Sequence, residues 1–289
     1  MIKRRINGFL KLIRLGVSVF GCISLIISGI LAGDLRDLQT EYLLALLIVF
    51  ISAAGSFAIN DYCDYEIDKS NNRSDRPLVL NLISRRTSLY IATISFILVF
   101  ILGIFLNPLA MIFVYINLII FYLYSLRLKK IIFFKNILVA YSYVAIILLG
   151  SIVSDAEIEP IIIYFSSMAF IVGLANEIMF DIADLEGDKA GGIKTLPKLL
   201  GIKKTARIVV ILYIIIIILD PLPFFVNIDD RLLYDFSFLI SIMIPVFSYV
   251  LLSRSLIKNH SKENVSKLRV YIFIIMLIGT ISYLLGVLI

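Results

Sequence analysis

The sequence has few cysteine and histidine residues, which supply the thiol and imidazole groups of many active sites and metal sites. Its 289 residues include two cysteines, one histidine and no tryptophan. Cys22 lies in an apolar run and Cys63 lies among acidic residues, so a disulfide framework or a cysteine-based zinc site cannot be built from them. His260 stands in a polar segment far along the chain from the acidic motifs described below. These shortages exclude a histidine-based metal site and a catalytic triad that contains histidine.

Charged residues are also few, since they make up 17% of the chain, whereas hydrophobic residues make up 61%. The mean hydropathy of +1.02 lies far above the range of soluble domains. Apolar runs follow one another along the sequence, each of about 20 residues, the length that crosses roughly 30 Å of hydrocarbon as a helix. The runs are continuous and do not alternate, which favours helices over a β-barrel. The sequence therefore predicts an all-α integral membrane protein.

Nine segments are long and apolar enough to be transmembrane helices. The basic N-terminal stretch leads directly into the first, which we interpret as a span and not as a cleaved signal peptide. The seventh is the weakest because Asp220, Pro221 and Pro223 interrupt it, and prolines kink or end helices. The predicted spans are Leu15–Ala32, Tyr42–Ile59, Ser88–Leu106, Leu109–Ser125, Ile131–Val153, Ile161–Phe180, Ile208–Val226, Leu232–Leu252 and Leu268–Ile289.

The distribution of positive charge predicts how these spans are oriented. If all nine cross, the N-terminus and the loops after spans two, four, six and eight share one side and carry 25 of the 27 lysines and arginines. Only Arg36 and Arg231 fall on the other side. The positive-inside rule then places the N-terminus and the crowded loops in the cytoplasm, beneath the plasma membrane. The net charge of +6 follows mostly from this topology, so the sequence gives no reason to expect a nucleic-acid partner.

An acidic motif, D-x-x-D-x-E-x-D-K, occurs twice at an offset of 120 residues. Its aspartates fall at positions i, i+3 and i+7, a spacing that places them on one face of a helix. Three like charges on one face repel one another, and a divalent cation commonly neutralises them. The aspartates are Asp61, Asp64 and Asp68 in the first copy and Asp181, Asp184 and Asp188 in the second.

The constant offset fits an internal duplication of a four-helix unit. In this interpretation, residues 1–289 form a single transmembrane domain with repeat-like halves at about 1–130 and 131–255, and the helix at 268–289 is extra. Four helices in each half keep both acidic motifs on the same side of the membrane. We therefore expect a cytoplasmic polar cap over a central cavity.

Two carboxylate arrays on one side of a membrane suit a polyanionic ligand that carries its own Mg²⁺ ions. A diphosphate with a long hydrocarbon tail would fit both the acidic ends and the apolar wall behind them. Arg73 and Arg76 follow the first motif and Lys194 follows the second, so these cations could bind the diphosphate and stabilise its charge as it departs. A single acidic triplet is more often a solvated helix end, but two copies at one offset favour a site.

Other functions explain the motifs less well. Acids within membrane segments can serve ion transport, but these lie at the ends of spans and not at mid-depth. The segment Gly187–Thr195 lacks both the glycine-lysine pairing and the preceding strand of a P-loop. A CDP-alcohol phosphotransferase requires D-x-x-D-G followed by A-R, which neither copy has. The stretch from Tyr124 to Lys130, which closes span four, is either an interfacial anchor or a phosphate-binding element.

Three motifs in this order resemble those of the UbiA superfamily of intramembrane prenyltransferases. The resemblance implies nine helices, with carboxylates that hold Mg²⁺ on an isoprenyl diphosphate. It further implies that the C1–O bond of the donor ionises to an allylic cation, which a membrane-resident lipid acceptor captures. The family's N-D-x-x-D-x-x-x-D is matched by Asn60, Asp61, Asp64 and Asp68, its D-x-x-D-x-x-x-D by Asp181, Asp184 and Asp188, and its Y-S-x-x-L-K by Tyr124, Ser125, Leu128 and Lys129.

Within the superfamily, D-Y-E-I-D-K and D-L-E-G-D-K-A-G-G-I-K-T-L-P are most similar to archaeal members that make the second ether bond of archaeal lipids. Those enzymes transfer a geranylgeranyl group from geranylgeranyl diphosphate to geranylgeranylglyceryl phosphate. The resemblance leaves an aromatic or tetrapyrrole acceptor as the alternative. Arg14, Lys11 and Lys130 are candidates to bind the acceptor's phosphate, by charge and side alone.

The resemblance also implies which residues react. Asp64, Asp68, Asp184 and Asp188 are the expected catalytic carboxylates, and one aspartate, which the sequence does not identify, takes the proton of the acceptor hydroxyl. No protein partner is inferred. The chain departs from the family's pattern where Leu15 replaces a proline after Arg14.

Overall fold

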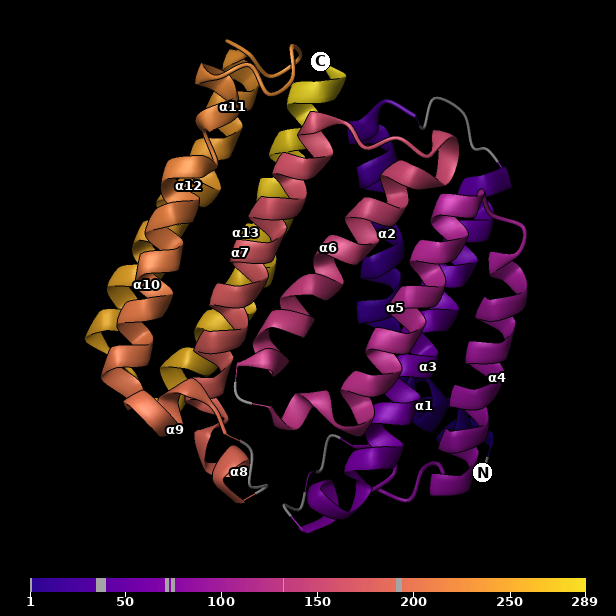
Figure 1. The fold of residues 1–289 in the computed structure, drawn as a ribbon. Coiled ribbons are helices and arrows are strands. Elements are labelled where there is room, and N and C mark those ends of the chain that lie inside the picture. The colour runs from indigo at the N-terminus through magenta and orange to yellow at the C-terminus, as the bar shows by residue number, and fades with distance from the viewer. Residues whose placement is uncertain (1, 35–39, 71–72, 74–75, 132, 191–193) are drawn as a thin grey trace. The chain divides into compact units, whose positions relative to one another are not determined.

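The computed structural model describes residues 2–34, 40–70, 73, 76–131, 133–190 and 194–289, and all regular structure in these residues is helical (Figure 1). Nine helices of this described part are long and apolar enough to cross a membrane, which confirms the predicted class and number of spans. The predicted four-helix repeat, its halves and the cytoplasmic cap over a central cavity stay predictions.

The spanning helices follow the predicted segments closely. The first matches to the residue, whereas the second extends well past its predicted end at Ile59. They are α2 (Leu15–Ala32), α3 (Thr40–Ser70), α4 (Arg85–Gly103), α5 (Pro108–Leu126), α6 (Phe134–Asp155), α7 (Pro160–Ala183), α10 (Ile202–Leu219), α12 (Phe236–Lys258) and α13 (Lys262–Leu288). The short helices are α1 (Ile2–Leu12), η1 (Leu128–Lys130), α8 (Leu185–Ala190), α9 (Leu196–Leu200) and α11 (Leu222–Phe225).

The seventh span shows the interruption that its prolines predict. Helix α10 ends at Leu219, and the short helix α11 follows Asp220 and Pro221. The helix also begins at Ile202, earlier than predicted, because its basic first turns lower the local hydropathy without breaking the helix. The eighth span begins at Phe236 and not at Leu232. The Asp235 side chain caps α12, because it accepts hydrogen bonds from the backbone N–H groups of Ser237 and Phe238.

Two compact units make up the chain, and each is described by itself. The first comprises Met1–Gly29, Asp34–Lys129 and Leu149–Glu157, and the second comprises Ile30–Gly33, Lys130–Leu148 and Ile158–Ile289.

In the first unit, α4 and α5 pack against the long helix α3. Gly55 of α3 lets α4 approach so closely that an added Cβ would lie 2.7 Å from the Ser95 side chain. The Ser88 hydroxyl of α4 donates to the carbonyl of Ala58 at 2.8 Å, an interhelical bond typical of membrane bundles. Helix α3 has 31 residues. At 1.5 Å per residue it is about 46 Å long, so its last turns continue past the hydrocarbon core.

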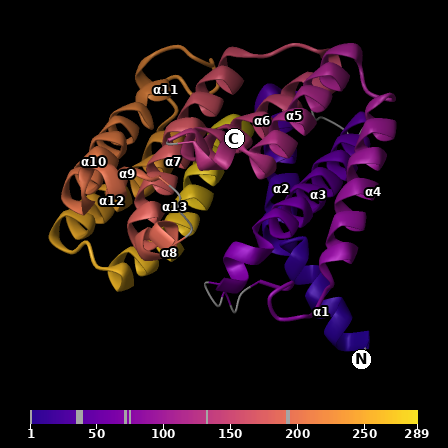
Figure 2. The same cartoon turned by 60° about the horizontal axis from the view of Figure 1, so that its bottom comes forward.

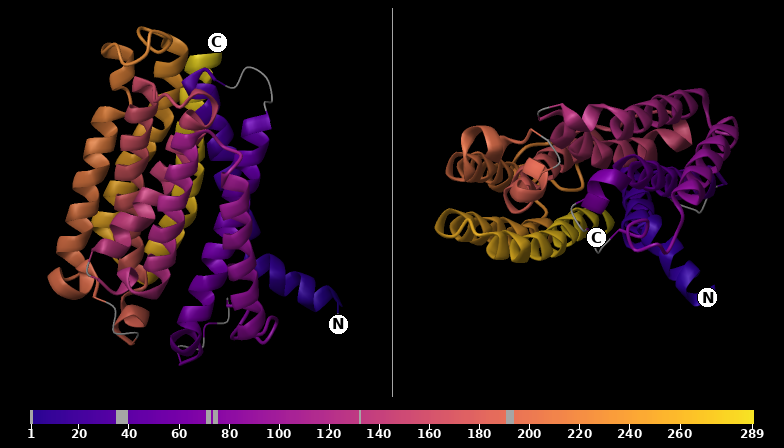
Figure 3. Two further views of the ribbon diagram at one scale, coloured as in Figure 1. Left: turned by 45° about the vertical axis from the view of Figure 1, so that its right-hand side comes forward. Right: turned by 90° about the horizontal axis from the view of Figure 1, so that it is seen from below.

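Helix α1 was not anticipated from the sequence, which we interpreted only as a basic stretch before the first span. It runs from Ile2 to Leu12 and projects from the helices of its unit (Figure 3). Leu12 is fully buried, and Gly8 lies against the side chains of Leu82 and Ile83. Arg14, with φ of 45°, turns the chain from α1 into α2.

In the second unit, α7, α10, α12 and α13 pack side by side (Figure 1). Tyr213 of α10 lies at the centre, where its hydroxyl donates to Asn176 at 3.1 Å and its ring lies 5.2 Å from that of Tyr249. Helix α6 approaches α7 at Gly173, where an added Cβ would lie 2.9 Å from the Tyr143 ring and 3.1 Å from Ala140. Small residues at helix contacts are a feature of membrane bundles.

Large apolar side chains cover the outer surfaces of both units. Phe105, Ile240 and Leu251 are 71%, 70% and 67% exposed. Exposure of so many large apolar side chains is unfavourable in water, but it is not unfavourable in lipid. The protein is a multi-pass membrane protein.

Close packing at Gly150 of α6 predicts a measurable cost for one added methyl group. In Gly150→Ala the new Cβ would lie 2.6 Å from the carbonyl oxygen of Leu25, a backbone atom that cannot rotate away. We expect the free energy of unfolding to fall by about 1–3 kcal/mol, which would be measured as a lower midpoint of thermal unfolding in detergent. Gly279→Ala is the control, because its Cβ meets nothing closer than Pro245 at 3.9 Å. Equal midpoints for the two variants would contradict the tight contact.

Candidate active site

The last turns of α3 carry the first acidic motif on a continuous helix, as the spacing predicts. Asp61 is 3% exposed and lies against two arginines. Its Oδ1 atom is 3.0 Å from Nη1 of Arg76 and 3.5 Å from Nη2 of Arg14. A carboxylate with so little access to water requires such partners, because an unpaired buried charge is strongly unfavourable.

Arg76 connects the first and third aspartates of this motif. Its Nε atom lies 3.2 Å from Oδ2 of Asp68, while its Nη1 binds Asp61. The backbone N–H of Arg73 donates to the carbonyl of Asp68 at 3.1 Å, which keeps this part of the chain at the end of α3. Arg76, selected from the sequence as a diphosphate ligand, therefore binds two aspartates of the motif.

Arg14 lies over the ring of Phe57 at 4.4 Å while it reaches Asp61. Burial lowers the pKa of the Arg14 guanidinium and Arg76 lowers it further, whereas Asp61 raises it. Two guanidinium groups therefore converge on the Asp61 carboxylate.

Lys129, the last residue of the Y-S-x-x-L-K element, binds the middle of the first motif. Its Nζ atom lies 2.5 Å from Oδ1 of Asp64 and donates to Oδ1 of Asn60 at 3.1 Å. The Ser125 hydroxyl donates to Phe121 within α5, and Tyr124 is half-buried on the same helix. Lys129 thus contacts the first motif in this structure, whereas Ser125 bonds within its own helix.

A hollow of about 470 Å³ opens beside Asp61. Two of the side chains that line it, Arg73 and Arg76, were predicted to bind the diphosphate, and two others, Lys11 and Arg14, were predicted to bind the acceptor's phosphate. Its lining residues are Lys11, Arg14, Asp61, Arg73, Arg76 and Pro77. Four cations against one carboxylate make this hollow suited to an anion.

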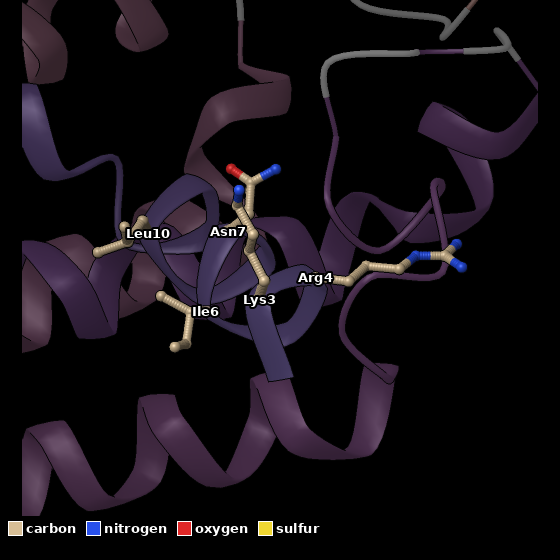
Figure 4. Close-up of a pocket in the computed structure, with 5 residues that line it drawn as sticks. All are labelled: Lys3, Arg4, Ile6, Asn7 and Leu10. Atoms are coloured by element: carbon tan, nitrogen blue, oxygen red, sulfur yellow. The ribbon is translucent and has the colours of Figure 1, made fainter. Parts of the chain in front are cut away.

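A second hollow lies along α1, where Lys3, Arg4, Ile6, Asn7 and Leu10 fan out from a single helix (Figure 4). All five residues come from one helix, which gives this hollow no opposing wall. We assign no ligand to it.

The second motif begins on the last turn of α7, where Asp181 is 1% exposed. Its Oδ1 atom lies 2.5 Å from Nζ of Lys135, and its Oδ2 atom accepts from Nδ2 of Asn136 at 2.8 Å. Both partners lie at the start of α6. Asp181 thus has a hydrogen-bonding partner on each oxygen.

The second motif departs from the continuous helical face that its spacing predicts. Helix α7 ends at Ala183, and Asp184 adopts φ of −92° and ψ of 3°, outside the α-helical region. The chain resumes as α8, which lies at the end of α7 (Figure 2). Asp188 lies on α8, but its side chain and that of Lys130 fall outside the described part of the structure. Lys194, selected from the sequence, is exposed beyond α8.

Asp184 has a partner that sequence analysis missed. Nη2 of Arg269, on α13, lies 2.9 Å from Oδ2 of Asp184, and the guanidinium lies 4.2 Å above the ring of Phe180. Lys135 and Asn136 were missed as well. A signal for Lys135 exists in the sequence, since it begins the fifth span just as Arg14 precedes the first.

The donor atoms of the two motifs fit Mg²⁺. Carboxylate and amide oxygens are the ligands that this ion prefers, and a few of them suffice when substrate phosphates complete its shell. Lysine or arginine compensates each of the five described aspartates in this structure. A bound metal ion would add positive charge beside the aspartates of the motif that holds it.

The family model of the UbiA prenyltransferase family matches residues 20–286. The chain belongs to this family. It is 32% identical to the digeranylgeranylglyceryl phosphate synthase of Archaeoglobus fulgidus, with 99% of this chain and 97% of that protein covered. It is 33% identical to the synthase of the same name from Saccharolobus solfataricus, with 97% of each chain covered.

Solved structures agree with the fold. A structure described as giving "Structural and mechanistic insights into the biosynthesis of Digeranylgeranylglyceryl phosphate synthase in membranes" superimposes with a TM-score of 0.78, at 29% identity, over 98% of both chains. A UbiA homolog from Archaeoglobus fulgidus bound to GPP and Mg²⁺ superimposes with a TM-score of 0.70, at 22% identity, over 96% of this chain and 98% of that one. The UbiA fold predicted from three short motifs is confirmed.

Proposed function

We propose that this protein transfers a geranylgeranyl group from geranylgeranyl diphosphate to geranylgeranylglyceryl phosphate, in a reaction that requires Mg²⁺. The product carries the second ether bond of archaeal membrane lipids. The observation that carries this proposal is the likeness, over nearly the whole chain, to curated digeranylgeranylglyceryl phosphate synthases. The bias of lysine and arginine toward one side supports a cytoplasmic site in the plasma membrane.

The acidic motifs bind the donor's diphosphate through Mg²⁺. The proposed ligands are Asp61, Asp64, Asp68, Asp181, Asp184 and Asp188, assisted by Asn60. Bound Mg²⁺ supplies positive charge that stabilises the diphosphate as a leaving group. A UbiA homolog that shares this fold has been solved with DMAPP and Mg²⁺, which supports the choice of ion and donor class.

The reaction breaks one bond and forms another. The C1–O bond of the donor breaks, and its electron pair leaves with the diphosphate. The resulting allylic cation is attacked at C1 by the acceptor's hydroxyl oxygen, which then gives up its proton to a carboxylate. Lys129 and Arg76, already paired with these aspartates, are placed to stabilise the departing negative charge.

The cationic hollow beside Asp61 binds the phosphate of the acceptor. Lys11, Arg14, Arg73 and Arg76 line it, and a phosphate monoester is the part of geranylgeranylglyceryl phosphate that needs such partners. A neutral aromatic ring has no corresponding charge. The hollow therefore favours the glyceryl phosphate acceptor over an uncharged aromatic one.

The acceptor class can be tested directly. Purified protein with labelled geranylgeranyl diphosphate and Mg²⁺ should form a lipid product with geranylgeranylglyceryl phosphate, and chelation by EDTA should abolish it. Reactions with an aromatic quinone precursor and with a tetrapyrrole serve as comparisons. Product from either of these, and none from the glyceryl phosphate, would reject the proposed acceptor.

The metal assignment predicts that Asp64→Asn and Asp184→Asn each lower kcat/KM by more than about 100-fold, because each removes a proposed ligand without changing side-chain volume. Steady-state assays measure the loss, and thermal unfolding verifies that each variant is folded. Glu66→Gln is the matched control, since its side chain is 70% exposed on the same helix as Asp64. Activity near the wild-type level in either aspartate variant would contradict the assignment.

The hollow predicts that Lys11→Gln changes acceptor binding alone. Losing one charge-assisted hydrogen bond should raise the KM for geranylgeranylglyceryl phosphate by about 10-fold, with the donor's KM unchanged. Lys3→Gln, which removes an exposed charge elsewhere on α1, is the control. An equal rise in both KM values for Lys11→Gln would show that the residue does not distinguish the two substrates.

A further inference from the structure

Arg269 reaches the second acidic motif from the ninth span, which the sequence led us to treat as extra. Its Nη2 atom lies 2.9 Å from Oδ2 of Asp184, and its guanidinium lies over Phe180 at 4.2 Å. Phe180 and Asp184 are one helical turn apart at the end of α7. Arg269 therefore contacts both an aromatic face and a carboxylate of this last turn.

Asp184 is less restrained in its position by its surroundings than Asp64 is. It caps α7 in a non-helical conformation, and its side chain is 52% exposed, against 19% for Asp64. An exposed ion pair alone holds a side chain weakly. The ring of Phe180 restrains the guanidinium, however, and an arginine fixed in this way can orient the carboxylate that it binds.

The Arg269 guanidinium also has one N–H donor that is available for a further hydrogen bond. The Nε atom of Arg269 is buried and has no hydrogen-bond partner among the residues that the structure describes. A buried donor without a partner is unfavourable, so the group gains if a carboxylate or phosphate oxygen approaches it. Arg269 is thus suited to stay at the site when an anionic ligand arrives.

Lys129 and Asp64 form the corresponding pair in the first motif. Lys129 lies on η1, after the fourth span, and binds the second aspartate of its motif; Arg269 lies near the start of the ninth span, the next helix after the eighth, and does the same. The first aspartates show a parallel arrangement: Arg14 precedes the first span and binds Asp61, while Lys135 begins the fifth and binds Asp181. In both motifs, cations from the same places in the order of spans bind the same aspartates.

We propose that Arg269 is a positioning residue for Asp184, and that it is the second motif's counterpart of Lys129. It holds Oδ2 of Asp184 and leaves Oδ1 to a Mg²⁺ ion of the bound diphosphate. Hydrogen bonds from outside the metal's own ligands orient carboxylates in this way and raise metal affinity. The inference rests on the proposed function for the identity of the ligand, and it makes α13 a part of the site.

The test measures metal binding without turnover. Wild-type protein, Arg269→Gln, Arg269→Lys and Lys267→Gln are titrated with Mn²⁺ in the presence of inorganic diphosphate, and bound Mn²⁺ is followed by electron paramagnetic resonance. Arg269→Gln should weaken Mn²⁺ binding by about 10-fold or more, and Arg269→Lys should restore part of the loss. Lys267 is exposed on the same helix, so its variant should match the wild type. Unchanged or tighter binding by Arg269→Gln would mean that the arginine only competes with the ion, and would overturn the proposal.

A double-mutant cycle tests whether Arg269 acts through Asp184. If it does, Arg269→Gln should cause no further loss of Mn²⁺ binding in the Asp184→Asn background. Fully additive losses would overturn the positioning role. These measurements use inorganic diphosphate, so their outcome is separate from the acceptor assay: failure to form the ether lipid would reject the proposed function and leave the role of Arg269 standing.

Discussion

The need to compensate buried carboxylates at the ends of apolar helices governs the organisation of both units. Asp61 and Asp181 are almost completely buried, and a buried charge without a partner is strongly unfavourable. Neither can be satisfied from its own helix. Arg14 and Arg76 come from segments on either side of the apolar spans α2 and α3, and Lys135 comes from the start of α6. The acidic motifs therefore fix where the ends of neighbouring helices meet, in addition to providing oxygen ligands.

Identical spacing in the two motifs does not give identical local structure. Helix α3 continues through all three aspartates of the first copy, while α7 stops one residue before Asp184. The first motif is consequently a rigid helical face, whose middle carboxylate binds Lys129 from beyond α5. The second is divided between α7 and α8, and its middle carboxylate depends on Arg269 from a helix much later in the chain. The repeated sequence pattern thus has two different backbone conformations, although a cation from a later segment binds the middle carboxylate of each copy.

Hydropathy predicted the spans well because the membrane imposes one length on them, and α2 was predicted to the residue where Arg14 and Gly33 bound its apolar run. Hydropathy carries no signal once a helix leaves the apolar layer, so the predicted span ended at Ile59, and only the spacing of the aspartates indicated that the helix continues. Helix α1 was missed because its apolar residues lie on one side of a short basic segment. The aspartates were predictable from their repetition. Arg269 was not, because its contact depends on the packing of α13 against α7, which sequence spacing does not reveal.

Charge balance links the two substrates of the proposed reaction. Arg14 and Arg76 bind Asp61, and both also line the cationic hollow. Their positive charge is therefore divided between the carboxylate and any anion in that hollow. When Mg²⁺ carried by the donor compensates the motif, less of this charge is needed at Asp61 and more is available to a phosphate. Binding of the donor and binding of a phosphate-bearing acceptor should accordingly favour one another, through two arginines that serve both.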